Sequence, residues 1–168
     1  MNIYLKELEV DDDIRYYNLL KELSNYDAYA KPVPKEFDYS MYDFFKNIRV
    51  KMKNEGKVST YYVMDGDIPV GYATINHKAD LTKPGGHFGL CLKKSYQNKG
   101  LGSIVSSLLF DIAYTNLGIK EAIFTSKNEN IQSQKSVLKT GAELVSIHDG
   151  YRFYIIDLEK VCKKNKKI

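Results

Sequence analysis

The segment Gln97-Asn98-Lys99-Gly100-Leu101-Gly102-Ser103 decides the fold of this chain. It follows an apolar run at residues 88–92 that is typical of a strand, and it precedes an amphipathic helix. A strand, a glycine-bearing loop and a helix N-terminus form an anion site, because glycines let the backbone approach a ligand and the first-turn N–H groups lack intrahelical acceptors. The helix dipole adds partial positive charge, so the segment predicts a site for a phosphate or pyrophosphate.

Two familiar nucleotide-binding loops also place glycines before a helix, and neither matches. A Walker loop requires a Gly-Lys pair followed by Ser or Thr, which this sequence lacks. The dinucleotide fingerprint requires a third glycine, but the run that begins at Gly100 ends in Val105. The remaining pattern is Gln/Arg-x-x-Gly-x-Gly/Ala. The alternative to a phosphate site is that residues 97–103 form a strand-to-helix turn that binds no ligand.

The composition describes a soluble globular protein. Of the 168 residues, 43% are hydrophobic and 27% are charged, and a chain of this length buries about 68–70% of its unfolded surface. We expect one domain over residues 1–159 and a basic tail over residues 160–168. The N-terminal residues lack a long apolar run, so we expect neither a signal peptide nor a membrane-spanning helix. Cys91 and Cys162 lie far apart in the sequence, so we expect neither a disulfide framework nor a metal cluster. Proteins of the cytoplasm typically lack disulfides, so we expect a cytoplasmic protein.

The net charge of +4 originates at the C-terminus. Five lysines occupy the last nine residues, and without them the chain has 20 basic and 21 acidic residues. A nucleic-acid interface requires basic residues gathered on one folded face. We therefore expect a solvated tail and no nucleic-acid partner.

Hydrophobic periodicity predicts a mixed sheet covered by helices. The predicted strands cover about residues 1–10, 59–64, 69–76, 88–92, 121–126, 142–147 and 151–158. The predicted helices end near residues 24, 56, 118 and 140, and residues 25–40 form an irregular connection. Asn128 or Asn130 is the expected N-cap of the last helix.

This order of elements, together with the loop from Gln97 to Ser103, resembles the GNAT superfamily of N-acetyltransferases. Asn130 to Gly141 is similar to the family segment N-x-x-A-x-x-x-Y-x-K-x-G, with Ser133 at the small residue and Lys139 at the lysine. Within the superfamily, the chain resembles a bacterial branch of predicted acetyltransferases without an assigned substrate. The resemblance implies an α/β (α+β) fold with a mixed, mostly antiparallel sheet of about seven strands, about four flanking helices, and splayed fourth and fifth strands.

The resemblance also implies acetyl-coenzyme A as co-substrate, without a metal. In the family, the glycine loop holds the pyrophosphate, and the slot between the splayed strands holds the pantetheine arm. The implied coenzyme-binding residues are Leu90, Cys91, Leu92, Gln97, Asn98, Lys99, Gly100, Leu101, Gly102, Ser103, Thr125, Ser126, Asn130 and Ser133. Lys99 either adds a charge to this site or points into water.

The acceptor amine requires a route for its proton, since an alkyl ammonium with a pKa of about 10.4 has no lone pair at neutral pH. His87 is the candidate base, because it lies just upstream of the coenzyme strand and titrates in the right range. The alternative is that His87 is a hydrogen-bonded strand residue. Glu129 is a weaker candidate and is otherwise a surface carboxylate.

The thiolate leaving group benefits from an acid. Many relatives use a tyrosine at the position of Val137. Tyr151 is therefore the candidate acid here, with another of the 14 tyrosines as the alternative, unless these residues serve only in packing. Direct attack in a ternary complex requires only positioning, so Cys91 is not expected to act as a covalent nucleophile.

The acceptor site is expected at residues 26–42 and 147–151. Aromatic residues there either line a pocket for a small amine, an amino acid or a peptide terminus, or they roof the core: Tyr26, Tyr29, Phe37, Tyr39 and Tyr42. The leading hypothesis is an N-acetyltransferase that acts on a primary amine of a small molecule or peptide. The alternative, motivated by Val137, is a degenerate acetyl-coenzyme A sensor or scaffold. A homodimer is the expected assembly.

Overall fold

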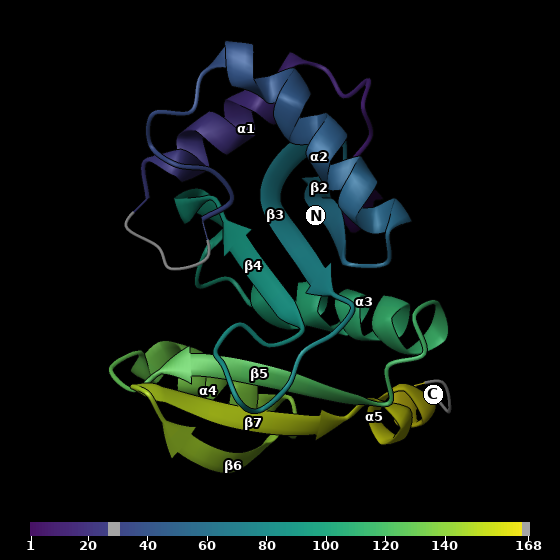
Figure 1. Cartoon of the computed structure of the whole chain (residues 1–168), viewed down its shortest axis with the longest axis vertical. Coiled ribbons are helices and arrows are strands. Elements are labelled where there is room, and N and C mark those ends of the chain that lie inside the picture. The colour runs from purple at the N-terminus through teal and green to yellow at the C-terminus, as the bar shows by residue number, and fades with distance from the viewer. Residues whose placement is uncertain (27–30, 166–168) are drawn as a thin grey trace. The chain divides into compact units, whose positions relative to one another are not determined.

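The computed structural model describes residues 1–26 and 31–165, apart from the side chains of residues 164 and 165. Its strands are β1 (Ile3–Glu7), β2 (Val58–Asp65), β3 (Ile68–Asn76), β4 (Phe88–Leu92), β5 (Glu121–Lys127), β6 (Glu143–His148) and β7 (Tyr151–Asp157). Its α-helices are α1 (Ile14–Ser24), α2 (Tyr42–Asn54), α3 (Leu101–Thr115), α4 (Ile131–Lys139) and α5 (Leu158–Asn165), and the short 3-10 helices are η1 (Tyr39–Met41) and η2 (Lys94–Tyr96) (Figure 1).

The chain divides into two compact units. The first unit comprises Met1–Ile75 and Gly89–Val105, and the second comprises Asn76–Phe88 and the residues from Ser106 onward. The first unit contains a four-stranded sheet in the order β1-β2-β3-β4, and the second contains a three-stranded sheet in the order β5-β7-β6. β4 and β5 are therefore edge strands of separate sheets.

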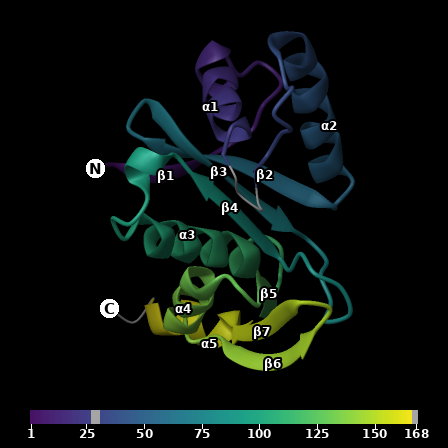
Figure 2. The ribbon, with the colours of Figure 1, turned by 90° about the vertical axis from the view of Figure 1, so that its left-hand side faces the viewer.

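In the first unit, α1 and α2 cover the same side of the four-stranded sheet (Figure 2). Alternate residues of a strand face one side, so Tyr62 and Met64 of β2 both point toward these helices. They are 0% and 1% exposed and pack against the leucines of α1. Gly71 allows β3 to approach β4 closely, because a Cβ there would lie 2.6 Å from Leu92 Cδ2.

In the second unit, β7 pairs antiparallel with both β5 and β6. The β6–β7 ladder contains an irregularity between Leu144 and Ser146. Asn130 caps α4 by accepting a hydrogen bond from Ser133 N over 3.1 Å, which confirms one of the two expected caps. Phe88, Phe110 and Phe124 form an aromatic cluster with ring centroids 5.3–5.8 Å apart.

The arrangement of antiparallel strands and flanking helices confirms the predicted fold class. The expected basic tail is helical at its start, because residues 158–165 form α5. Leu158 and Cys162 lie four residues apart on one helix face, and both are buried. These two apolar contacts hold a lysine-rich segment in a helix. The lysines at 166 and 167 lie outside the described residues, and the boundary at residue 159 stays a prediction.

The longest α-helix that the structure describes, α3, has 15 residues. None of the helices within residues 1–26 and 31–165 has the length and apolar character needed to cross a membrane.

Candidate functional site

The glycine loop joins β4 to α3 and lies wholly within the first unit. Asn98 and Gly100 have positive φ angles of 59° and 78°, a conformation that glycine adopts freely and asparagine tolerates. Residues 97–100 are exposed, whereas Leu101 is 1% exposed. The buried leucine fixes the start of α3, and the exposed backbone before it can turn toward a ligand.

Open space surrounds both glycines. A Cβ built on Gly100 or Gly102 meets no heavy atom within 4 Å. The first turn of α3 contains no acidic residue. The backbone here is therefore accessible to an anion, and a side chain at either glycine would occupy space next to the first-turn N–H groups. This geometry fits the diphosphate of coenzyme A.

Three hydrogen bonds brace the loop. Gln97 Nε2 donates to Leu92 O over 2.9 Å, closing the loop on the end of its own strand. Tyr96 Oη donates to Asp65 Oδ2 over 3.0 Å, and Lys94 N donates to Tyr26 Oη over 2.9 Å. Because these partners come from three segments of the first unit, the loop is held before any ligand arrives.

Lysines surround the loop. Lys99 is exposed, and its Nζ lies 6.0 Å from the centroid of the Tyr96 ring, at the limit of a cation–π contact. Lys93 Nζ lies 3.9 Å from Glu22 Oε1, and Lys94 Nζ lies 5.1 Å from the Tyr26 ring centroid. The ammonium groups make the surroundings favourable for phosphate oxygens.

Cys91 lies on β4 and is 6% exposed. Burial disfavours the thiolate and raises the pKa of the Cys91 thiol to about 11. A neutral thiol is a poor nucleophile, so this environment argues against a covalent role for Cys91.

His87 lies in the second unit, where its ring and backbone both bond to Ile123 of β5. Ile123 N donates to His87 Nδ1 over 2.9 Å, and His87 N donates to Ile123 O over 2.8 Å. Burial lowers the pKa of His87, which favours the neutral ring. A neutral ring that accepts at Nδ1 carries its proton on Nε2, which leaves no lone pair for a substrate proton. The geometry favours the hydrogen-bonded strand residue over the base.

The predicted coenzyme residues of β5 and of the start of α4 also lie in the second unit, and the side chains of two of the four are engaged locally. Thr125 Oγ1 accepts from Gly85 N over 3.1 Å, and Asn130 Oδ1 is used in capping Ser133 N. Ser126 differs, because its hydroxyl is buried without a hydrogen-bond partner among the described residues.

The position of the family's usual acid and the candidate that replaces it differ in chemistry. Val137 is 8% exposed and has no proton to donate. Tyr151 is half-buried at the start of β7, in register with Lys127 of β5 and His148 of β6. The roles of His87, Tyr151 and the coenzyme-binding residues stay predictions.

The aromatic residues predicted to line an acceptor pocket are largely packed. Phe37 and Tyr42 are 3% and 1% exposed, and Tyr42 Oη donates to Asp13 O over 3.0 Å. Tyr17, which the sequence did not single out, lies within 5.1–5.9 Å of the rings of Phe37, Tyr39 and Tyr42. These contacts favour a roof over the core, with Tyr39 as its exposed edge. Tyr29 lies outside the described residues.

Two features of the second unit escaped the sequence analysis. A cavity of about 290 Å³ is lined by the loop that follows β3, including Asn76, Lys78 and Lys83. His148 anchors the same loop, since its Nε2 lies 2.9 Å from Leu81 O and its Nδ1 lies 2.9 Å from Asp149 Oδ2. The contact with Leu81 leaves no local sequence signal, because it joins residues 67 positions apart.

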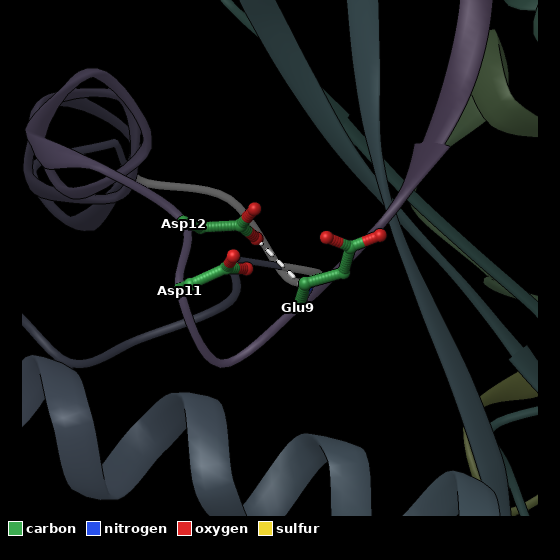
Figure 3. A group of neighbouring side chains, drawn as sticks. All are labelled: Glu9, Asp11 and Asp12. Atoms are coloured by element: carbon green, nitrogen blue, oxygen red, sulfur yellow. Dashed lines mark hydrogen bonds between the residues drawn. The ribbon is translucent and has the colours of Figure 1, made fainter.

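An acidic group lies at the start of α1, where Glu9, Asp11 and Asp12 place carboxylate oxygens within 4.8 Å of one another (Figure 3). Asp12 Oδ2 accepts from Glu9 N over 2.8 Å, and its Oδ1 pairs with the Lys6 ammonium. Asp12 is therefore engaged in shaping the turn between β1 and α1.

Solved structures with this fold include proteins of varied description. FdhC, a nucleotide-linked sugar GNAT in apo form, is 17% identical, with a TM-score of 0.74 over 99% of this chain and 92% of its own. A spermidine N-acetyltransferase SpeG chimera from Vibrio cholerae and hSSAT is 15% identical, with a TM-score of 0.73 over 96% and 99%. Campylobacter jejuni PseH, an N-acetyltransferase in complex with acetyl coenzyme A, is 14% identical, with a TM-score of 0.68 over 92% and 98%.

At these identities the likeness establishes the fold. No curated protein matches the sequence significantly. The family profile described as "Acetyltransferase (GNAT) domain" matches residues 2–143. The chain therefore belongs to the GNAT acetyltransferase family.

Proposed function

We propose that this protein transfers an acetyl group from acetyl-coenzyme A to a primary amine of a small molecule or peptide. The observation that carries the proposal is the β4–α3 loop, whose glycines are open, whose backbone is braced and whose surroundings are cationic. Membership of the GNAT family supports acetyl-coenzyme A as the donor.

In the proposed reaction, the neutral amine attacks the thioester carbonyl carbon and a C–N bond forms. The C–S bond then breaks, coenzyme A leaves as a thiolate, and the nitrogen of the new amide loses its surplus proton to water. The backbone of residues 98–103 holds the diphosphate, and positioning lowers the barrier to direct attack. Since Nδ1 of His87 is already engaged, we propose that the ammonium proton leaves through water. Tyr151 remains the proposed acid for the thiolate.

Small-molecule acceptors are supported by the described activities of proteins with this fold, which include a nucleotide-linked sugar GNAT and a spermidine N-acetyltransferase. We propose a cytoplasmic enzyme, and a homodimer as its assembly. The predicted contacts of Leu90, Cys91, Leu92, Thr125 and Ser126 with the pantetheine arm belong to the same proposal.

The test measures thiol release when purified protein receives acetyl-coenzyme A and a panel of amines that spans amino sugars, polyamines, amino acids and peptide N-termini. Release above the hydrolysis background with at least one amine supports the enzyme. Saturable binding of acetyl-coenzyme A without release from any amine supports a sensor or scaffold, which the aliphatic Val137 and the engaged His87 favour. Absence of binding to folded protein would refute both functions.

A further inference from the structure

Tyr26 connects two segments of the first unit that are 68 residues apart in sequence. It follows α1 and lies partly buried against the aromatic core. Its hydroxyl accepts a hydrogen bond from Lys94 N over 2.9 Å and donates one to Glu22 Oε2 over 2.9 Å. We propose that Tyr26 is a positioning residue that fixes the entrance of the β4–α3 loop, an inference that rests on the function proposed above.

The Lys94 amide is the first N–H of η2, the turn that leads into the glycine loop. N–H groups at the start of a helix lack intrahelical acceptors, and Lys93, the N-cap residue, provides no side-chain hydrogen bond. The phenol oxygen of Tyr26 accepts the hydrogen bond from Lys94 N that an N-cap side chain would otherwise accept. Removing that oxygen leaves this N–H without its protein partner and frees the turn that precedes Gln97.

Glu22 makes the interaction directional. A phenol has one proton, and because that proton is donated to Glu22, the oxygen lone pairs are available to Lys94 N–H. Lys93 Nζ lies 3.9 Å from the other oxygen of the Glu22 carboxylate, Oε1. The end of α1 is thus joined to the loop entrance through a hydrogen-bond pair and an ion pair.

The position of Tyr26 explains why such a link matters. Tyr26 is the first residue of the segment expected to contact the acceptor, and its hydroxyl contacts the segment expected to hold the donor. A displacement of Tyr26 itself would therefore change the loop through Lys94. By linkage, acceptor and donor would then affect each other's binding to the same extent.

The test compares Tyr26→Phe with wild type by calorimetric titration of acetyl-coenzyme A. The substitution deletes one oxygen and keeps the ring, so we expect the dissociation constant to rise about fivefold or more. Tyr4→Phe is the matched control, since Tyr4 Oη donates to Gly66 O over 2.9 Å in the same unit, at the β2–β3 turn. The control is expected to bind within about twofold of wild type.

Two further readouts separate positioning from simple stability. Amide hydrogen exchange at Lys94 is expected to accelerate in Tyr26→Phe and to stay unchanged in Tyr4→Phe. Once an acceptor is identified, Tyr26→Phe is expected to raise KM for acetyl-coenzyme A while kcat is retained. If wild type binds acetyl-coenzyme A and Tyr26→Phe binds it equally well, the inference on Tyr26 is wrong and the proposed function survives. If wild type does not bind, both are wrong.

Discussion

The β4–α3 loop and the β5–α4 segment both contain residues that the family resemblance predicts to bind the coenzyme, but the polar groups of the two regions have different surroundings. In the loop, side chains brace the backbone from outside, and the glycines remain open. In the β5–α4 segment and the adjacent His87, the polar atoms are mostly engaged in local hydrogen bonds. A site formed by the main chain depends on the course and exposure of the backbone, whereas a site formed by side chains depends on the contacts that each side chain makes.

The largest effect is expected for His87→Ala, which tests the local hydrogen bonds of the second unit. The substitution removes the acceptor of the buried Ile123 N–H, and we expect the free energy of unfolding to fall by about 1–3 kcal/mol, measured by urea titration. His87→Asn supplies an acceptor oxygen and should recover part of that stability. A base would behave otherwise, because neither variant can accept a proton near neutral pH. A loss of kcat of about 10²-fold or more in a stable His87→Asn protein would restore His87 as the base.

Burial also gives His87 a pH signature. Its pKa is lowered in the folded protein, so the unfolded chain binds the proton first as the pH falls. The stability that neutral His87 confers is complete above about pH 6.5 and is lost progressively as the pH falls from there to the lower folded pKa. Urea titrations at pH 5.5 and pH 7.5 should show this loss in wild type and a smaller one in His87→Asn.

The next largest effect is expected for Gly100→Asp, which tests the β4–α3 loop. This change adds a side chain in the left-handed conformation and a negative charge beside the expected phosphates, so we expect the dissociation constant for acetyl-coenzyme A to rise at least about tenfold. Gly56→Asp is the matched control, because Gly56 has a φ of 70° and equally open space in the same unit. Equal affinity of the two folded variants would remove the loop from the site.

The smallest effect is expected at His148, whose ring contacts the loop that follows β3 and whose pKa is shifted. Its two ring nitrogens lie against the carboxylate of Asp149 and the carbonyl of Leu81, and both contacts are satisfied only by the imidazolium. The hydrogen bond to Asp149, followed by that to Leu81, raises the pKa of His148. The contribution is therefore present below about pH 6.5 and is lost as the pH rises through the folded pKa.

His148→Gln is expected to remove this contribution, and the difference from wild type should shrink as the pH rises. Amide exchange at residues 81–83, followed from pH 5.5 to 8.5, measures the anchoring directly. Exchange rates that do not depend on pH beyond the intrinsic chemistry would show that the charge of His148 plays no part in holding this loop.

The amino-acid sequence by itself determined the elements and the backbone site. Helical and strand periodicity, the Asn130 cap and the glycine spacing at Gly100 and Gly102 are local properties, since each depends on residues a few positions apart. For that reason the mixed sheet with flanking helices and the glycine-bearing turn followed from the pattern, while the mostly antiparallel arrangement followed from the resemblance to the GNAT superfamily. Comparison with the family segment also showed that Val137 occupies the position where many relatives have a tyrosine.

Only the tertiary structure decided what the side chains do. Tyr26 meets Lys94, His87 meets Ile123, and His148 meets Leu81, and none of these pairs is close in sequence. The protonation state of a histidine depends on such partners and on burial. Whether a hydroxyl group has a hydrogen-bond partner depends on the same long-range contacts. The same holds for α5, because the contacts of Leu158 and Cys162 with the core outweigh the polarity of the lysines around them.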